Sequence, residues 1–331
     1  MKLLAVDDNP QILKTLPAIF RQANLRNIEL AASGAEALKL LEDPTRKFDV
    51  LLLDINMPQM DGIELCKRIR KMPRYHATPI LMLTSSTENQ RIERSFAAGA
   101  DDYLTKPFDV KEIVTRVRVA ERMAKRRTVI HTIDPGEVGI DLKEGQHPFS
   151  NNDPLRISYV EQLILPFSLG NYLSQLSRRR LNNCSVFSIK LMDVGLLYSS
   201  AKTPEFGFAL SLIVDTVSKI VNCPRLLMSY EGNGCFLCIT QTTEPLAWPG
   251  AEESIQELLD SHALPLENGW PMGLAIALGN PVTPNASSNQ RVKRTFERAR
   301  ERAVHREHYK IKNAFHTRQM LNNKNVKQLS S

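Results

Sequence analysis

The stretch Val50-Leu51-Leu52-Leu53-Asp54 decides the fold of the first part of the chain. Four consecutive apolar residues are typical of a strand that is buried on both faces, as in a parallel sheet covered by helices. The carboxylate of Asp54 then emerges where this strand ends. In open α/β sheets, ligands and chemistry gather at the carboxyl ends of the strands. Asp54 is therefore the first candidate functional residue.

Three further apolar runs end in polar side chains of matching chemistry. Leu3–Val6 is followed by Asp7 and Asp8, Ile80–Leu83 by Thr84, and Tyr103–Thr105 by Lys106. Because the carboxyl ends of parallel strands meet at one edge of a sheet, we expect three carboxylates, a hydroxyl and an ammonium group to converge there.

Crowded carboxylates repel one another, and they are stable together only if some are protonated or a cation lies among them. Mg²⁺ suits such a site, because it takes oxygen ligands and commonly joins one or two carboxylates to a phosphate. Asp54 is then placed as a nucleophile that becomes an aspartyl phosphate. Lys106 would balance the charge of the transferred group, and Thr84 would hydrogen-bond a phosphoryl oxygen.

Five motifs occur in order along residues 1–125. They are Asp7-Asp8, Asp54 with Asn56-Met57-Pro58 and Asp61-Gly62, Thr84-Ser85, Ala100-Asp101-Asp102-Tyr103, and Leu104-Thr105-Lys106-Pro107-Phe108. Together they resemble the CheY-like receiver domain of two-component response regulators.

The resemblance implies a role for each matching residue. Asp54 would be the phosphoacceptor; Asp8, Asp54 and the backbone carbonyl of Asn56 would hold Mg²⁺, with Asp7 orienting water around it. Thr84 and Tyr103 would form a switch pair, and the Lys106–Pro107 bond would be cis. The implied phosphodonor is a sensor histidine kinase or a phosphotransfer protein.

The order of strand and helix patterns predicts two domains and a connector. Residues 1–127 alternate between strand and helix signals, which predicts an α/β doubly wound, five-stranded parallel sheet. From 128 to 158 the pattern stops, and frequent Pro, Gly and Asn residues predict a linker. The patterns in residues 159–315 predict a second, α+β domain. Residues 316–331 are expected to form a basic, disordered tail.

The second domain has the predicted order α-β-α-β-β-α-β-α, which is typical of a ferredoxin-like sandwich. The strands 226–230 and 236–240 flank Asn233-Gly234, a dipeptide that strongly favours a tight hairpin.

Three places in this domain resemble the GGDEF domain of diguanylate cyclases. They are Leu169-Gly170-Asn171-Tyr172-Leu173, Asp193-Val194-Gly195, and the hairpin Gly232-Asn233-Gly234-Cys235-Phe236. The acidic positions of that family carry Gly195 and, at the hairpin, Gly234 with Cys235 or Asn233 with Gly234. Two-metal phosphoryl transfer needs anionic oxygen ligands on both ions. The resemblance therefore implies a degenerate GGDEF domain, which keeps the fold of the family but has only a vestigial, inactive site.

Charge, cysteine content and hydropathy indicate whether the chain binds nucleic acid, forms disulfides or spans a membrane. The net charge is +7, yet residues 291–331 alone carry 12 basic and 3 acidic side chains. A solvated helix face is favoured there over a contact with nucleic acid or anionic lipid, because it is the commoner explanation of such charge. No helix-turn-helix pattern is found, and residues 126–290 carry more acidic than basic side chains. The five scattered cysteines predict reduced thiols in a cytoplasmic protein, and no stretch approaches the ~18 apolar residues of a membrane span.

The sequence therefore predicts a response regulator that is phosphorylated on Asp54 and is not an enzyme beyond receiver phosphorylation and dephosphorylation. It would signal through an inactive GGDEF-like domain, by binding an unidentified downstream protein or by forming a phosphorylation-dependent homodimer. Two alternatives stay open: an active or unusual nucleotide cyclase, and a DNA-binding regulator that uses the basic C-terminal helix. GTP or cyclic di-GMP binding and the direction of regulation are also left open.

Overall fold

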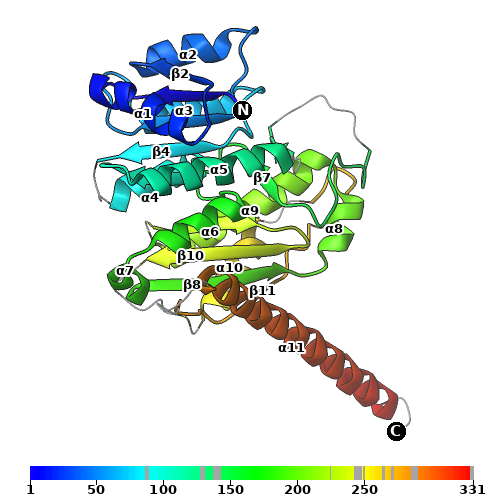
Figure 1. Cartoon of the computed structure of the whole chain (residues 1–331). Coiled ribbons are helices and arrows are strands. Elements are labelled where there is room, and N and C mark those ends of the chain that lie inside the picture. Colours follow the sequence, from blue (N-terminus) through cyan, green and yellow to red (C-terminus); the bar gives the residue numbers. More distant parts are fainter. Residues whose placement is uncertain are drawn as a thin grey trace. The chain divides into compact units, whose positions relative to one another are not determined.

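The computed structural model of the chain folds into two compact units (Figure 1). It describes residues 1–328 apart from 86–88, 127–130, 137–142, 224, 242–247, 249, 263–264, 270–271 and 285–289. Unit 1 comprises Met1–Ile130 together with Phe167–Tyr172, and unit 2 comprises His131–Pro166 and Leu173–Ser331.

Unit 1 contains a parallel sheet with the strand order β2-β1-β3-β4-β5. Its strands are β1 (Leu3–Val6), β2 (Ile28–Ala31), β3 (Val50–Asp54), β4 (Ile80–Thr84) and β5 (Asp102–Thr105). Its helices are α1 (Pro10–Gln22), α2 (Gly34–Glu42), α3 (Gly62–Lys71), α4 (Asn89–Ala97) and α5 (Val110–Arg126). The predicted doubly wound sheet is confirmed, and its order places the topological switch point between β1 and β3.

Strand β3 shows why the apolar run at its centre has no polar interruption. Leu51 and Leu53 belong to a core cluster that also contains buried side chains of α2 and α3. Val50 and Leu52 belong to a second cluster, with buried side chains of α1 and α5. Because successive side chains of a strand point to opposite faces, both faces of β3 are covered and every position must be apolar.

Unit 2 contains a six-stranded sheet with the order β11-β8-β10-β9-β7-β6. Its strands are β6 (His131–Ile133), β7 (Leu155–Ile157), β8 (Cys184–Leu191), β9 (Leu227–Tyr230), β10 (Cys235–Gln241) and β11 (Ile276–Leu278). Its helices are α7 (Arg178–Asn182), α8 (Val194–Ser200), α9 (Thr203–Val221), α10 (Ala251–His262) and α11 (Arg291–Gln328), and α6 (Pro166–Gln175) carries residues of both units. Neighbouring strands from β11 to β9 are antiparallel, and β9 and β10 form the predicted hairpin.

The structure differs from the predicted linker at 128–158. Part of this segment forms β6 and β7, which pair with each other, and β7 pairs with β9 at Leu155 and Tyr230. Strands of three residues carry too little alternation to be found from sequence, because their stability comes from the sheet edge they join. Residues 128–130 and 137–142 lie outside the described part of the chain.

The structure also differs from the predicted disordered tail at 316–331. Helix α11 continues through Gln328, and residues 329–331 lie outside the described part. Neither Gly nor Pro occurs between Arg291 and Gln328, so no residue in this stretch interrupts the helical backbone. No helix in the described portion is long and apolar enough to cross a membrane.

His147 anchors the segment between β6 and β7 to the body of unit 2. Its Nε2 lies 2.7 Å from the carbonyl oxygen of Tyr198, and its Nδ1 lies 3.0 Å from the hydroxyl of Thr203. The rings of Tyr198, Phe149 and Phe206 surround the imidazole at centroid distances of 4.3, 5.1 and 5.6 Å. Burial lowers the pKa of His147, against a smaller opposing effect of the Tyr198 carbonyl.

We expect unit 2 to lose stability as the pH falls below the ordinary histidine pKa of about 6.5. The folded state has the lower pKa, so the unfolded chain binds the proton more tightly; the stabilisation is complete above that pH and is lost on acidification. Thermal unfolding between about pH 8 and pH 5.5 measures the effect. His147→Phe should show a smaller acid-induced loss than the wild type, whereas His308→Phe, at an exposed position, should not differ from it. Equal losses in His147→Phe and the wild type would contradict the assignment.

Candidate functional site

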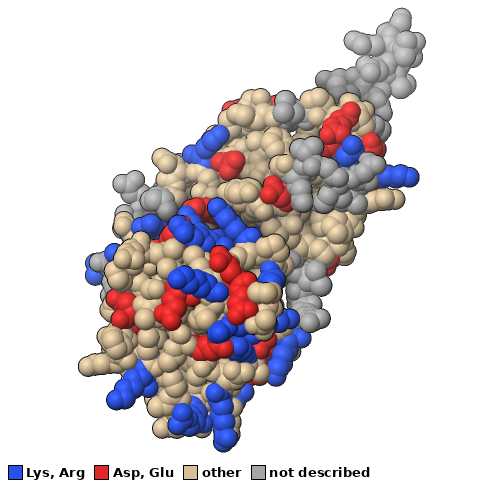
Figure 2. Space-filling model, turned by 90° about the horizontal axis from the view of Figure 1, so that it is seen from above, with Lys and Arg blue, Asp and Glu red and all other residues tan. Residues whose placement is uncertain are grey.

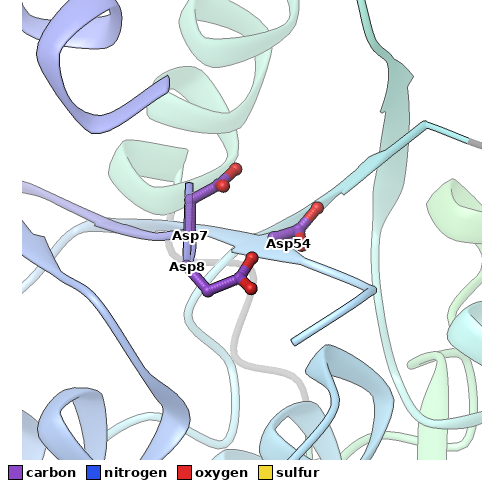
Figure 3. Close-up of side chains that lie close together, drawn as sticks. All are labelled: Asp7, Asp8 and Asp54. Atoms are coloured by element: carbon purple, nitrogen blue, oxygen red, sulfur yellow. The ribbon is translucent and has the colours of Figure 1, made fainter. Parts of the chain in front are cut away.

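Three carboxylates meet at the switch point of the unit 1 sheet. Asp7 and Asp8 directly follow β1, and Asp54 is the last residue of the neighbouring β3. One oxygen from each carboxylate lies within 4.8 Å of the others, and Figure 3 shows the three side chains around one space. Among the described residues, this is the one group of three or more Asp, Glu, His or Cys side chains close enough to share a metal ion. The predicted convergence of these residues is therefore observed.

Lys106, which follows β5, is the cation of this site. Its Nζ lies 2.5 Å from Asp7 Oδ2 and 2.7 Å from Asp54 Oδ1. The Lys106–Pro107 bond is cis, as the resemblance implies. One ammonium group is fewer than the three carboxyl groups that lie around it. Carboxylate oxygens are the ligands that a hard divalent cation such as Mg²⁺ takes in proteins.

The environment of Asp54 disfavours its negative charge. Asp54 is 3% exposed, and burial raises the pKa of its carboxyl group above the ordinary value. The hydrogen bond and charge of Lys106 oppose this effect, and the charges of Asp7 and Asp8 add to it. A divalent cation bound beside Asp54 would favour its ionised form. A buried carboxyl group with a raised pKa and a specific charged partner is typical of functional sites.

The loop after β3 folds back on Asp54, and Gly62 makes this possible. A Cβ atom at Gly62 would lie 2.0 Å from the backbone carbonyl oxygen of Asp54. The Gly62 N–H donates to the carbonyl of Ile55 at 3.0 Å, and Asp61 caps α3 by accepting from the Glu64 N–H at 2.8 Å. Asp61 and Gly62 thus shape the loop, and there is no space for a side chain at position 62.

Asn56 is held by Asp54, by Ser85 of the Thr84-Ser85 motif and by Arg91, which belongs to none of the sequence motifs. Its backbone N–H donates to Asp54 Oδ2 at 3.1 Å, its Nδ2 donates to Ser85 Oγ at 3.3 Å, and its Oδ1 accepts from the guanidinium of Arg91. Arg91 lies on α4, remote in sequence, so no local pattern could reveal this contact.

The two residues of the predicted switch pair lie on neighbouring strands. Thr84 is fully buried at the end of β4, opposite Thr105 in the parallel register. Tyr103 precedes Thr105 by two positions, so it shares a face of the sheet with Thr84. The ring of Tyr103 meets the buried ring of Phe96 edge-on, with centroids 6.2 Å apart.

The six residues of the predicted vestigial site lie at two neighbouring turns of unit 2. Asp193 has a left-handed backbone (φ 51°) at the start of α8, and Gly195 is exposed in that helix. The hairpin residues Gly232, Asn233 and Gly234 all have positive φ. The two turns adjoin, because the Leu191 N–H donates to the Gly234 carbonyl at 2.7 Å.

The hairpin turn is covered by the segment between β6 and β7. The Asn233 N–H donates to the carbonyl oxygen of Asn151 at 2.6 Å, and a Cβ at Gly232 would lie 2.2 Å from the carbonyl oxygen of Asn152. Cys235, at the start of β10, is partly exposed; burial raises the pKa of its thiol, which lies 3.5 Å from the Ser188 hydroxyl. The turn is therefore covered by the protein's own backbone at Gly232, while Asn233 is exposed, and residues 232–235 carry no carboxylate.

Comparisons with known proteins agree with the geometry of unit 1. The response regulator receiver domain family matches residues 3–118. The transcriptional regulatory protein ResD of Bacillus subtilis is 39% identical over 135 residues, which cover 40% of this chain and 53% of ResD. The phosphate regulon transcriptional regulatory protein PhoB of Rhizobium meliloti is 31% identical over 178 residues, covering 54% of this chain and 77% of PhoB.

A solved structure of the Vibrio cholerae chemotaxis protein CheY4 is 36% identical and covers 36% of this chain and 97% of that chain, with a TM-score of 0.34. The chain thus spans about half the length of ResD and about three quarters of PhoB. It belongs to the two-component response regulators, and residues 3–118 are its receiver domain.

The close approach of Gly62 to Asp54 generates a matched pair of variants. Gly62→Ala should destabilise unit 1 by at least about 1–3 kcal/mol, because the added methyl group overlaps a backbone oxygen that cannot move freely. Gly195→Ala should be neutral or stabilising by up to about 1 kcal/mol, because nothing lies within 4 Å of its Cβ position and alanine favours a helix. Thermal unfolding of both variants tests this, and equal stability of the two would contradict the described loop.

Proposed function

We propose that the receiver domain is phosphorylated on Asp54 and controls a second, GGDEF-like domain that has no cyclase activity. The observation that carries the first half is the contact of Lys106 with both Asp7 and Asp54, at the edge of the sheet where the three carboxylates meet. The phosphodonor would be a sensor histidine kinase or a phosphotransfer protein, and the exchange would take place in the cytoplasm.

In the proposed reaction, an oxygen of Asp54 attacks the phosphorus of a phosphohistidine on the partner. A P–O bond forms, the P–N bond breaks, and the imidazole of the partner keeps the electron pair and takes up a proton. Lys106 lies beside Asp54 Oδ1 and would then face the dianionic phosphoryl group. Thr84, at the end of the adjacent strand, would donate its hydroxyl to a phosphoryl oxygen.

The residues present fit Mg²⁺. Asp8, Asp54 and the backbone carbonyl of Asn56 would hold the ion, with Asp7 orienting its water, and the ion would neutralise charge on the transferred group. Asn56 is well suited to this task, because its position is fixed by Asp54, Ser85 and Arg91.

Two observations support a GGDEF-like but inactive second domain. The antiparallel order β11-β8-β10-β9, with a hairpin between β9 and β10, is that of a ferredoxin-like sandwich. Backbone of Asn151 and Asn152 lies against the hairpin turn, and residues 232–235 offer none of the anionic ligands that the metal ions of a cyclase need. We therefore propose that this domain acts by binding another protein or a second copy of the chain.

A DNA-binding role is the second candidate, because ResD and PhoB are named as transcriptional regulators. Helix α11 would be the element, yet three of its cations are engaged within unit 2. Arg300 pairs with Glu231 at 2.6 Å, and Arg306 and Lys310 pair with Glu252 at 2.9 and 3.3 Å. On the face drawn in Figure 2, lysines and arginines are interspersed with acidic residues. DNA affinity that falls steeply with salt would favour this candidate.

Asp54→Ala should abolish phosphate incorporation from a small acyl phosphodonor, because it removes the nucleophile. Removal of Mg²⁺ with a chelator should abolish incorporation into the wild type in the same way. The matched control is Asp260→Ala, at an exposed position of α10, which should incorporate phosphate normally. Incorporation that survives in Asp54→Ala, measured by intact-protein mass spectrometry, would rule out Asp54 as the acceptor.

The full-length protein should form no cyclic dinucleotide from GTP and Mg²⁺, with or without beryllofluoride as a mimic of the aspartyl phosphate. The physical reason is the lack of anionic metal ligands at Gly195 and at the hairpin. Chromatography of the products, beside an active diguanylate cyclase, measures this. Product in the beryllofluoride sample would make the protein an enzyme and overturn the second half of the proposal.

A further inference from the structure

The segment Phe167–Tyr172, remote in sequence from the receiver, belongs to unit 1 and is hydrogen-bonded to it. The Ser168 hydroxyl donates to Asp101 Oδ1 at 3.1 Å, and the Asn171 amide donates to the Asp101 carbonyl oxygen at 2.9 Å. The Tyr172 hydroxyl donates to Glu93 Oε1 at 3.1 Å. Ser168, Tyr172, Asp101 and Glu93 are all buried, at 2, 1, 3 and 7% exposed. We call Phe167–Tyr172 the latch segment.

Asp101 is a rigid anchor for the latch segment. Its second carboxylate oxygen accepts hydrogen bonds from the Arg70 guanidinium and from the Ile80 N–H, both at 2.9 Å. Asp101 stands directly before β5, and Ile80 begins β4. The contacts of Ser168 and Asn171 are therefore made to the framework of the sheet.

Tyr172 makes its contacts to a different element, helix α4. Its hydroxyl binds Glu93 and its ring packs edge-on against Phe96, with centroids 5.5 Å apart. Glu93 and Phe96 are three positions apart on one face of α4. The latch segment thus bridges the sheet, through Asp101, and α4, through Tyr172.

Phe96 also joins the latch segment to the switch pair. Its fully buried ring meets both Tyr103 and Tyr172 edge-on, with centroid distances of 6.2 and 5.5 Å. A rearrangement of Tyr103, or a displacement of α4 against β5, would therefore change the surroundings of Tyr172. Hydrogen bonds near 3 Å to both elements do not survive such a displacement together.

We propose that the latch segment is an intramolecular sensor of the receiver state, which favours one arrangement of α4 against β5 and so is coupled to the phosphoryl group on Asp54. This inference rests on the proposed phosphorylation of Asp54. Linkage makes the coupling reciprocal: if phosphorylation changes the docking of the segment, loosening the segment changes the affinity of Asp54 for a phosphoryl mimic by the same factor. Couplings of this kind are typically about 5–150-fold.

The test is the affinity of the full-length protein for beryllofluoride with Mg²⁺, by isothermal titration, in Tyr172→Phe and Ser168→Ala. Each variant removes one buried hydrogen bond and keeps the packing of the segment. The matched controls are Tyr159→Phe, at a position that is 80% exposed, and Ser199→Ala, whose exposed hydroxyl bonds only to its own helix at Leu196. Hydrogen exchange of the peptide around 166–176 is followed with and without the ligand.

We expect at least about a fivefold change in beryllofluoride affinity for the double variant Ser168→Ala/Tyr172→Phe, unchanged affinity for both controls, and a ligand-dependent change in exchange of the latch peptide. The direction of the change tells which receiver state the segment favours. A purely structural role predicts a lower melting temperature with unchanged affinity, and that result overturns the inference. Wild-type protein that fails to bind beryllofluoride would instead refute the proposed phosphorylation site.

Discussion

The receiver depends on the electrostatic balance between three carboxylates and one ammonium at the ends of β1, β3 and β5. Asp7 and Asp54 are buried, and bringing two such anions together costs free energy unless cations lie beside them. Lys106 lies within 2.7 Å of both and offsets part of this cost. The remaining carboxylate oxygens are of the kind that a hard divalent cation takes as ligands.

The backbone around this site holds Asp54 and Asn56 in place. The close approach of the β3–α3 loop to Asp54 requires a glycine at position 62, and Asn56 is held by contacts from two other elements. In unit 2 the turn between β9 and β10 has a different composition. Backbone of the preceding segment lies against the hairpin at Gly232–Gly234, and these three residues carry no carboxylate.

Much of unit 1 was predictable because its signals are local. An unbroken apolar run indicates a strand that is buried on both faces, which predicts the parallel sheet. Polar residues directly after such runs lie at the same edge of that sheet. The convergence of four side chains was therefore predictable: Asp7, Asp8, Asp54 and Lys106. The short strands β6 and β7, the cover over the hairpin and the contact of Arg91 with Asn56 were not predictable. Each depends on partners far away in sequence, and none leaves a periodic pattern.

The sequence by itself determined the receiver fold, the identity of its candidate phosphoacceptor and the uncharged residue types at Gly195 and at positions 232–235 of the second domain, because these follow from residue types at fixed local spacings. Only the tertiary structure decided what lies against Asp101 and Glu93, and what covers the hairpin. Burial and hydrogen bonding between distant segments are set by how the chain packs, which residue order alone does not specify. The latch segment, buried against α4 and the start of β5, is the clearest case.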